Sequence, residues 1–424
     1  MTEAQPRRRG PVDTIAPTSP DDIAGTCDPR FARVREEFAR NFAERGEVGA
    51  SVCVYLDGEP VVDLWGGTAD PATGTAWQRD TVNVVMSATK GAAALCAHIL
   101  RARGQLDFDA PVAQYWPEFA RHGKGGIRVR QVLSHQSGVC HVSSAVPEGG
   151  FFDWALMTAL IEDTEPFWEP GTRHGYHPFT LGYILGELVL RITGQSIGTF
   201  FRTEVAEPLG LDFWIGLPAE HEARVAPSIA WELDCGDPLP PPIQAAIADP
   251  ESMQARIGAN DGGWFGNLWD TRAAHAAELP AAGGITNARG LARMYAPLSL
   301  DGALGDVRLV DPADLAGMRG VCTAGDVDAY LLFRTAFSLG FAKSWDNRRV
   351  PGHNSMIIGE DAFGAPGAGG QIGFADPSHR LAFGYTMTRH GLGMALDPRG
   401  QSLIDAVYQT LGSPTCLPGF WVRT

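Results

Sequence analysis

Ser87 and Lys90 have the types and the spacing of a nucleophile and its base. The segment Ser87-Ala88-Thr89-Lys90 precedes apolar residues at helical spacing, so it should lie at a helix start. Residues three apart on a helix share a face, so the lysine amine can reach the serine hydroxyl. The free N–H groups and positive dipole end of a helix N-terminus also favour negative charge on oxygen. The alternative is a Ser87 that only caps the helix and a solvated Lys90.

Lysine is rare in this chain. It occurs at Lys90, Lys124 and Lys343, whereas Lys and Arg together number 34. A buried lysine can lose its proton and act as a base, which arginine cannot do. This usage favours a chemical role for Lys90.

A second serine motif competes with Ser87. Gly194–Gly198 fits G-x-S-x-G around Ser196, but that nucleophile elbow needs a buried strand before it and a helix after it. Here it follows an apolar segment, Leu181–Ile192, that has the spacing of a helix. We therefore predict that Ser196 is not the nucleophile. His135 and His353 are interpreted as structural histidines.

The elements that must position Ser87 follow from apolar periodicity and turn residues. Both ends of the chain contain strand patterns, and the middle is mainly helix and loop. At the N-terminal end we expect a helix from Phe31 that Gly46 closes, followed by strands Ala50–Leu56 and Val61–Trp65, which Asp57-Gly58 joins and Gly66-Gly67 ends. Next we expect a helix from about 87 that Gly104 stops, and helices Leu181–Ile192 and Asn287–Leu298. At the C-terminal end we expect strands Gln371–Ala375 and Leu381–Met387 and a closing helix with Leu403, Val407 and Leu411 on one face.

This order predicts an α+β fold with one antiparallel sheet built from both chain ends. The expected parts are a flexible tail over 1–28, an α/β domain over 29–107 and 281–424, and a mainly helical insertion over 108–280. A cleft between the two lobes is the usual place for a site.

Composition limits the class of protein. The chain has 424 residues, 44% hydrophobic and 20% charged, which is typical of a packed globular protein. Its net charge of -15 argues against nucleic acid as a partner. We find no apolar run long enough for a membrane span and no signal peptide. The seven cysteines form no metal-binding pattern, so we expect a cytoplasmic protein without metal or organic cofactor.

Ordered blocks across nearly the whole chain carry a family resemblance. The blocks are Val61–Gly67, Ser87–Lys90, Val132–Gly138, Pro170-Gly171 with Tyr176, Leu181–Tyr183, Thr193–Ser196, Pro280–Asn287, Gly367–Gly370 and Phe374–Pro377. In these blocks the sequence resembles the serine hydrolases related to class C β-lactamases and D,D-peptidases, and among them the carboxylesterase branch, the family VIII esterases.

The resemblance implies roles for particular residues and a β-lactamase/transpeptidase-like fold. Ser87 matches the nucleophile. Lys90 matches the basic partner, which takes the serine proton or holds a second base anionic. Tyr176 matches the tyrosine that passes a proton to the leaving group, although it can act as a base only if a cation such as Lys90 lowers its pKa. The backbone N–H groups of Ser87 and Ala368 match the oxyanion hole, with Ala368 on a strand, and Gly367 and Gly369 should allow substrate to approach closely.

Two departures from the family pattern narrow the substrate. Pro178 replaces an asparagine that donates to an acyl amide, and Ala365 replaces a cation that meets a substrate carboxylate. Both losses favour a small neutral ester, hydrolysed through a Ser87 acyl-enzyme. The alternatives are a weak β-lactamase, a D-aminopeptidase or other amidase, or an acyltransferase on the same site. A binding protein that has lost turnover is a further alternative.

Overall fold

The fold is described from a computed structural model of the chain. It describes residues 23–230, 238–266, 268–350, 352, 354–416 and 419–423. Residues 1–22 of the tail expected over 1–28 lie outside these residues, as does His353.

The helices of the described chain agree with the expected segments and add several short ones in the middle. Their bounds are α1 (Ala32–Glu44), α2 (Thr89–Ala102), α3 (Val112–Tyr115), α4 (Val129–Leu133), α5 (Trp154–Glu162), α6 (Thr180–Thr193), α7 (Ile197–Phe201), α8 (Glu207–Leu209), α9 (Pro241–Ala248), α10 (Met253–Ala259), α11 (Arg272–Ala276), α12 (Ala288–Ser299), α13 (Leu315–Arg319) and α14 (Pro398–Thr410).

The strands come mainly from the two ends of the chain. They are β1 (Ala24–Cys27), β2 (Gly49–Leu56), β3 (Glu59–Asp70), β4 (Thr75–Ala76), β5 (Asn83–Val84), β6 (Phe213–Ile215), β7 (Gly284–Thr286), β8 (Ala303–Leu304), β9 (Val307–Arg308), β10 (Thr323–Gly325), β11 (Thr335–Phe337), β12 (Phe363–Pro366), β13 (Ile372–Asp376), β14 (Leu381–Met387), β15 (Thr415–Cys416) and β16 (Phe420–Trp421).

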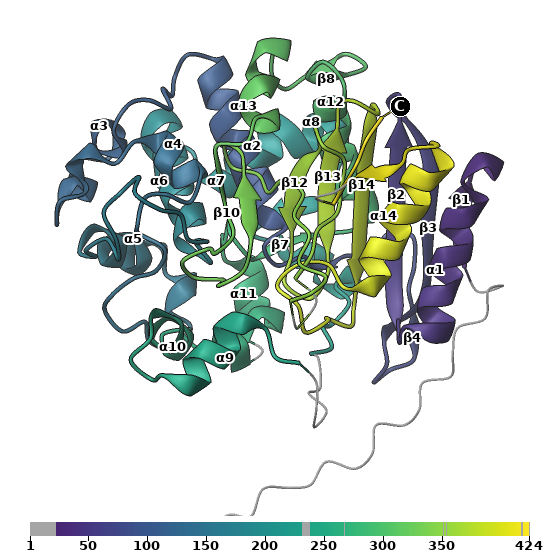
Figure 1. The fold of residues 1–424 in the computed structure, drawn as a ribbon, viewed down its shortest axis with the longest axis horizontal. Coiled ribbons are helices and arrows are strands. Elements are labelled where there is room, and N and C mark those ends of the chain that lie inside the picture. Colours follow the sequence, from purple (N-terminus) through teal and green to yellow (C-terminus); the bar gives the residue numbers. More distant parts are fainter. Residues whose placement is uncertain are drawn as a thin grey trace, which may run out of the picture.

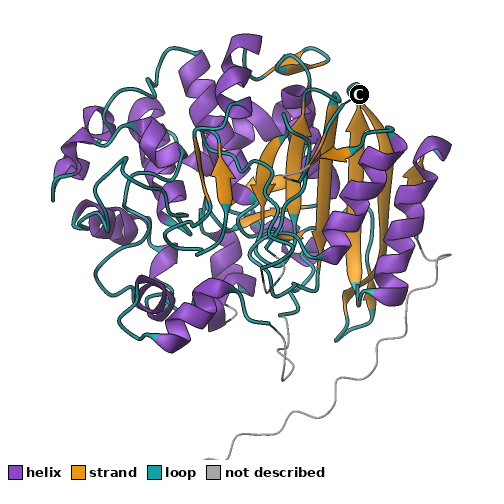
Figure 2. Ribbon diagram, in the orientation of Figure 1, coloured by secondary structure: helices purple, strands orange, loops and turns teal. Residues whose placement is uncertain are grey.

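The main sheet is antiparallel and joins both chain ends. Its order is β1-β3-β2-β14-β13-β12, and β4 pairs with β3. The central pairing of β2 with β14 joins the N-terminal hairpin to the C-terminal one, with Cys53 opposite Gly384. Figure 1 shows the purple and yellow segments side by side, with the helical middle of the chain beside the sheet (Figure 2). This arrangement confirms the predicted α+β fold class.

Helices cover both faces of this sheet. Along β2, Val52 and Val54 belong to a hydrophobic cluster with residues of α1 and α14, whereas Cys53 and Tyr55 belong to a cluster with residues of α12. This alternation is the period of two that a strand buried on both faces requires. In Figure 1, α1 and α14 lie in front of the sheet.

Two details of the predicted N-terminal region are wrong. Residues 24–27, assigned to the tail, form β1 and pair with β3, with Ala24 opposite Trp65. An edge strand offers unpaired backbone groups to such a segment, even one without an apolar pattern. The second strand also continues to Asp70 rather than ending at Gly66-Gly67. Gly67 stays in the strand with a positive φ of 79°, and a Cβ there would lie 2.1 Å from the carbonyl oxygen of Val48.

In its described residues the helical middle carries one short strand, β6, which pairs with β7 of the last segment. The domain boundaries at 107/108 and 280/281 stay a prediction. None of the helices in the described ranges has the length and hydropathy needed to span a bilayer.

Gly384 sets how closely α12 packs on β14. A Cβ at this position would lie 2.1 Å from the carbonyl oxygen of Ala288. Gly384→Ala should therefore lower the free energy of unfolding by about 1–3 kcal/mol through overpacking. The matched control is Gly258→Ala in α10, where a Cβ meets nothing within 4 Å. That change should be neutral or stabilise by up to about 1 kcal/mol. Urea unfolding of both variants checks the pair, and equal effects would contradict the packing argument.

Candidate active site

Ser87 lies in a tight turn just before α2. The preceding residue, Met86, has a positive φ of 47°, a strained conformation for a side chain of that size. The Thr89 hydroxyl donates to the Met86 carbonyl at 2.6 Å and accepts from the Gly284 N–H at 2.8 Å. The turn is therefore fixed to β7, and Ser87 remains partly exposed.

Lys90 is brought to Ser87 as the three-residue spacing predicted. Its Nζ lies 2.9 Å from the Ser87 Oγ, 2.7 Å from the Pro178 carbonyl oxygen and 2.9 Å from the Ala281 carbonyl oxygen. Lys90 is only 4% exposed. Burial lowers the pKa of its amine well below the ordinary value.

All three lysines of the chain are buried, with Lys124 0% and Lys343 3% exposed. Lys124 donates to the carbonyl oxygens of Glu162 and Thr164. Among the contacts of the described residues, Lys90 alone touches a serine hydroxyl. The sparing use of lysine therefore coincides with buried positions, one of which is the candidate site.

Tyr176 completes the group from the helical middle of the chain. Its phenol hydrogen-bonds with Ser87, and its ring centroid lies 4.7 Å from the Lys90 Nζ. Burial raises the pKa of Tyr176, and the hydrogen bond with Ser87 lowers it. The ring packs against His135 and Phe337, at centroid distances of 5.0 and 6.2 Å.

Two neutral histidines support the loop that carries Tyr176. His177 Nδ1 lies 2.9 Å from the Gly175 carbonyl oxygen, so Nδ1–H donates there. Its Nε2 then accepts from the Ser137 hydroxyl at 2.6 Å. His135 Nδ1 accepts from the His177 N–H at 3.2 Å. Burial lowers the pKa of His135, and lowers that of His177 to about 3. His135 is thus buried and hydrogen-bonded, which agrees with its interpretation as a structural histidine.

Ala368 lies in the turn that follows β12, not on a strand as predicted. Gly369 and Gly370 have φ of +95° and +115°, which end the strand pairing at Pro366. The N–H groups of Gly367, Gly369 and Gly370 donate to backbone carbonyls, whereas that of Ala368 donates to no acceptor within the described ranges. One N–H of this turn is therefore left for another acceptor.

The glycines of this turn have packing reasons of their own. A Cβ on Gly367 would lie 2.4 Å from the Val85 carbonyl oxygen, and one on Gly369 would lie 2.7 Å from the His390 Cβ. The first contact places the turn against the segment that leads to Ser87. Close approach to protein atoms thus accounts for both glycines, and their contact with substrate stays a prediction.

Ser196 is a capping residue. Its side chain accepts from the Thr199 N–H at the start of α7 and donates to Glu278 at 2.6 Å. Helix α6 precedes it, so the strand that a nucleophile elbow needs is missing at this place, as predicted.

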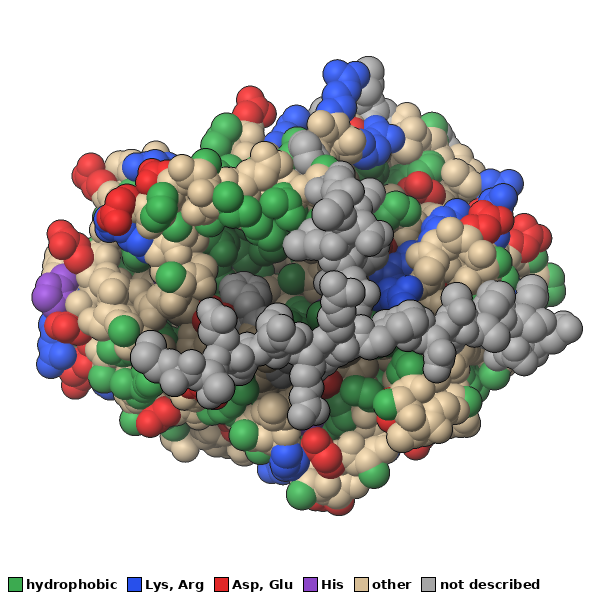
Figure 3. All heavy atoms as spheres, turned by 90° about the horizontal axis from the view of Figure 1, so that it is seen from below, with side chains coloured by type: hydrophobic (Ala, Val, Ile, Leu, Met, Phe, Trp, Pro, Cys, Tyr) green, Lys and Arg blue, Asp and Glu red, His purple; other side chains and the backbone are tan. Residues whose placement is uncertain are grey.

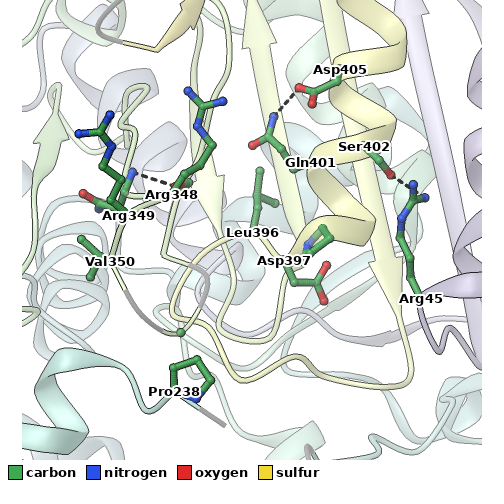
Figure 4. Close-up of a pocket in the computed structure, with 14 residues that line it drawn as sticks. Arg45, Pro238, Arg348, Arg349, Val350, Leu396, Asp397, Gln401, Ser402 and Asp405 are labelled. Atoms are coloured by element: carbon green, nitrogen blue, oxygen red, sulfur yellow. Dashed lines mark hydrogen bonds between the residues drawn. The ribbon is translucent and has the colours of Figure 1, made fainter.

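A cavity of about 590 Å³ lies elsewhere, against α14. Figure 4 shows Gln401 and Asp405 of α14 on the side of Arg348, and Ser402 turned toward Arg45. Ser87, Lys90 and Tyr176 do not line it, so this cavity is separate from the candidate site. The face in Figure 3 is hollowed near its middle, and hydrophobic side chains gather there.

The fold and this cluster agree with what the chain is similar to. The Beta-lactamase family model matches residues 35–406, and the chain belongs to this family. It is 34% identical over 378 residues to the Esterase/beta-lactamase LipL of Mycobacterium tuberculosis, covering 87% of this chain and 83% of the relative. The family resemblance read from the sequence is confirmed.

Solved structures give the same result. A family VIII carboxylesterase superposes with a TM-score of 0.80 at 37% identity, over 92% of this chain and 99% of that one. A penicillin-binding protein homologue from Caulobacter crescentus superposes with a TM-score of 0.77 at 36% identity, over 92% of this chain and 100% of that one. The chain is a hydrolase of the β-lactamase superfamily with esterase relatives.

Sequence reasoning missed three groups at this cluster. Two are the carbonyl oxygens of Pro178 and Ala281, which any residue could supply, so no sequence signal marks them. The third is Asp328, whose carboxylate accepts from the Tyr176 N–H at 3.1 Å. It stands in no recognisable motif and is far from Tyr176 along the chain.

Proposed function

We propose that the protein is a serine carboxylesterase that hydrolyses neutral short-chain esters through an acyl-enzyme on Ser87. One observation carries the proposal: the Lys90 Nζ touches one hydroxyl and two carbonyl oxygens. A neutral amine has two N–H donors and one lone pair. Carbonyl oxygens only accept, so the two N–H groups serve Pro178 and Ala281, and the lone pair faces the Ser87 hydroxyl.

These contacts suit proton transfer from Ser87 to Lys90. As the serine oxygen attacks the ester carbonyl carbon, its proton moves to Lys90, which becomes an ammonium with three donors and three acceptors around it. The Tyr176 ring face, 4.7 Å away, also favours the cation once it forms. Lys90 is therefore stabilised in the form that the transition state requires.

Tyr176 acts as the acid for the departing alcohol. Its raised pKa keeps it protonated, so Lys90 rather than a tyrosinate is the base. The negative oxygen formed on the ester carbonyl accepts from the N–H groups of Ser87 and Ala368. Its collapse breaks the bond to the alcohol, which takes the Tyr176 proton, and Lys90 returns a proton to Tyr176. Water then attacks the acyl-enzyme by the reverse proton path, releasing the acid and restoring Ser87.

The proposal of a neutral substrate rests on Pro178 and Ala365. Pro178 has no N–H and uses its carbonyl for Lys90, so this residue offers no donor to an acyl amide. Ala365 is 5% exposed, and its methyl group packs close to Gly91 of α2. It supplies no cation for a substrate carboxylate.

A substrate panel tests the function. We expect p-nitrophenyl butyrate to exceed its carboxylate-bearing analogue, the p-nitrophenyl hemiester of succinic acid, by at least about tenfold in kcat/KM, because the cation at 365 is missing. A chromogenic cephalosporin and a D-alanine p-nitroanilide should be slower still, because no side-chain amide donates at 178. Higher kcat/KM on the β-lactam or the D-amino-acid amide would contradict the esterase assignment in favour of the lactamase or amidase alternative.

A further inference from the structure

Asp328 is a fully buried carboxylate that accepts hydrogen bonds from backbone N–H groups, including that of Tyr176. Its side chain is 0% exposed. Oδ1 accepts from the N–H groups of Tyr176, Tyr330 and Leu331 at 3.1, 2.9 and 2.8 Å. Oδ2 accepts from the Tyr176 N–H at 3.1 Å and the Thr335 hydroxyl at 3.2 Å.

These partners indicate an ionised carboxylate. Each partner just described, a backbone N–H or a hydroxyl, can donate its proton to Asp328. An ionised carboxylate can only accept hydrogen bonds, so this set of partners suits it. Burial raises the pKa of Asp328 above the ordinary aspartate value, and the N–H donors of Leu331 and Tyr176 oppose this rise without cancelling it. His174, whose Nε2 lies 3.8 Å from Oδ2, also bonds the Thr335 hydroxyl at 2.9 Å. The charge is therefore held by donors from two separate parts of the chain.

The Tyr176 loop is fixed residue by residue. The Gly175 N–H donates to the His135 carbonyl oxygen at 3.0 Å, and the His177 N–H to His135 Nδ1. Between them, the Tyr176 N–H donates to Asp328. Of these three acceptors, only Asp328 is a charged group, and hydrogen bonds to charged acceptors are about twice as strong as neutral ones.

We propose that Asp328 is the positioning residue that holds Tyr176 at hydrogen-bonding distance from Ser87. The inference rests on the proposed function, because it gives Tyr176 the role of acid to the leaving alcohol. Asp328 does not touch Ser87 or Lys90; it acts through the backbone of Tyr176. Tyr176 is faced by Lys90 from α2, by the neutral His135, and by Tyr330 and Asp328 from the loop before β11.

The chain offers a matched control in Asp376. This carboxylate is also 0% exposed and accepts from the Ser378 N–H at 3.0 Å and the Tyr408 hydroxyl at 2.7 Å. It lies at the end of β13 and bonds neither Tyr176 nor its loop. Asp376→Asn thus measures the cost of neutralising a buried, hydrogen-bonded carboxylate away from the site.

The test compares two esters whose leaving groups differ in whether they must be protonated as they depart. Ethyl butyrate needs its alcohol protonated on departure, whereas p-nitrophenyl butyrate releases a stable phenolate. Asp328→Asn should lower kcat on ethyl butyrate by roughly 10- to 100-fold with KM nearly unchanged, and lower kcat on the p-nitrophenyl ester much less. Asp376→Asn should change both esters alike, or neither.

A double-mutant cycle separates positioning from general damage. In a Tyr176→Phe background there is no phenol left to place, so Asp328→Asn should cost less than about twofold on either ester. An undiminished loss in that background, or a loss equal to that of Asp376→Asn on both esters, overturns the proposal. The proposed function fails separately, if Ser87→Ala retains the activity.

A milder variant covers the case in which Asp328→Asn does not fold. Thr335→Val keeps the charge and removes one donor to Oδ2. It should lower kcat on ethyl butyrate by roughly two- to tenfold, and by nothing further when Tyr176 is Phe. Thermal unfolding of each variant is measured alongside. A folded Thr335→Val enzyme with equal losses on the two esters also overturns the proposal.

Discussion

Ser87→Ala is expected to lower kcat/KM for p-nitrophenyl butyrate by on the order of 10⁴-fold or more, because no other group takes over a deleted nucleophile. Intact-mass measurement with a p-nitrophenyl phosphonate should find one adduct on the wild-type chain, on the Ser87 peptide, and none on the variant. All three lysine side chains are buried, so their amines should add little background labelling by the probe.

Ser196→Ala is the matched control for this result. Ser196 carries the competing motif but caps α7 and bonds Glu278, so its loss should cost only about 0.5–2 kcal/mol of stability and leave labelling intact. An adduct on Ser196, or esterase activity that survives Ser87→Ala, would sink the assignment of the nucleophile. A chain that neither labels nor turns over would instead be the binding relative.

Lys90→Arg should be nearly as damaging, with an expected loss of roughly 10²–10⁴-fold in kcat. Arginine keeps a positive charge but cannot lose its proton, so it cannot accept that of Ser87. Lys90→Met removes the amine without adding a charge and should show a similar loss. If Lys90→Arg kept most of the activity, Lys90 would be an electrostatic group and not the base. Urea unfolding of both variants separates loss of the base from loss of the fold.

The pH dependence of kcat/KM should report the titration of Lys90. Below its pKa Lys90 is an ammonium and cannot take a proton, so activity falls as the pH falls through that pKa. Because burial lowers this pKa well below the ordinary lysine value, the acid limb of the profile should lie well below that value too. Tyr176 stays protonated, since burial raises its pKa, so it should not limit activity on the acid side.

His135 offers a control for the acid limb of this profile. Burial lowers its pKa well below the ordinary histidine value, so we expect it to be neutral at neutral pH. His135→Asn should change the height of the profile through packing under Tyr176 while leaving the midpoint of its acid limb in place. A shift of that midpoint would assign the limb to the histidine instead.

Local sequence signals predicted the elements well where a short pattern decides the conformation. Asp57-Gly58 gave a two-residue hairpin turn in which both residues have positive φ, 52° and 84°. Gly104 follows the end of α2, with a φ of 69°. The errors fell where distant backbone decides the structure. Strand β1 forms because β3 offers it an edge, and β3 passes through Gly67 because Val48 requires a close approach there.

The amino-acid sequence by itself determined the pair at the centre of the site. Ser87 and Lys90 are three residues apart, so one turn at the start of α2 brings them together whatever surrounds it. The family resemblance supplied Tyr176 and Ala368 as candidates, but not their surroundings. Only the tertiary structure decided that Lys90 is buried against two carbonyl oxygens, that Tyr176 hydrogen-bonds Ser87, and that Asp328 holds the tyrosine backbone. The physical reason is that burial and backbone contacts depend on where distant segments meet, and a carbonyl oxygen or an N–H group is the same whichever residue carries it.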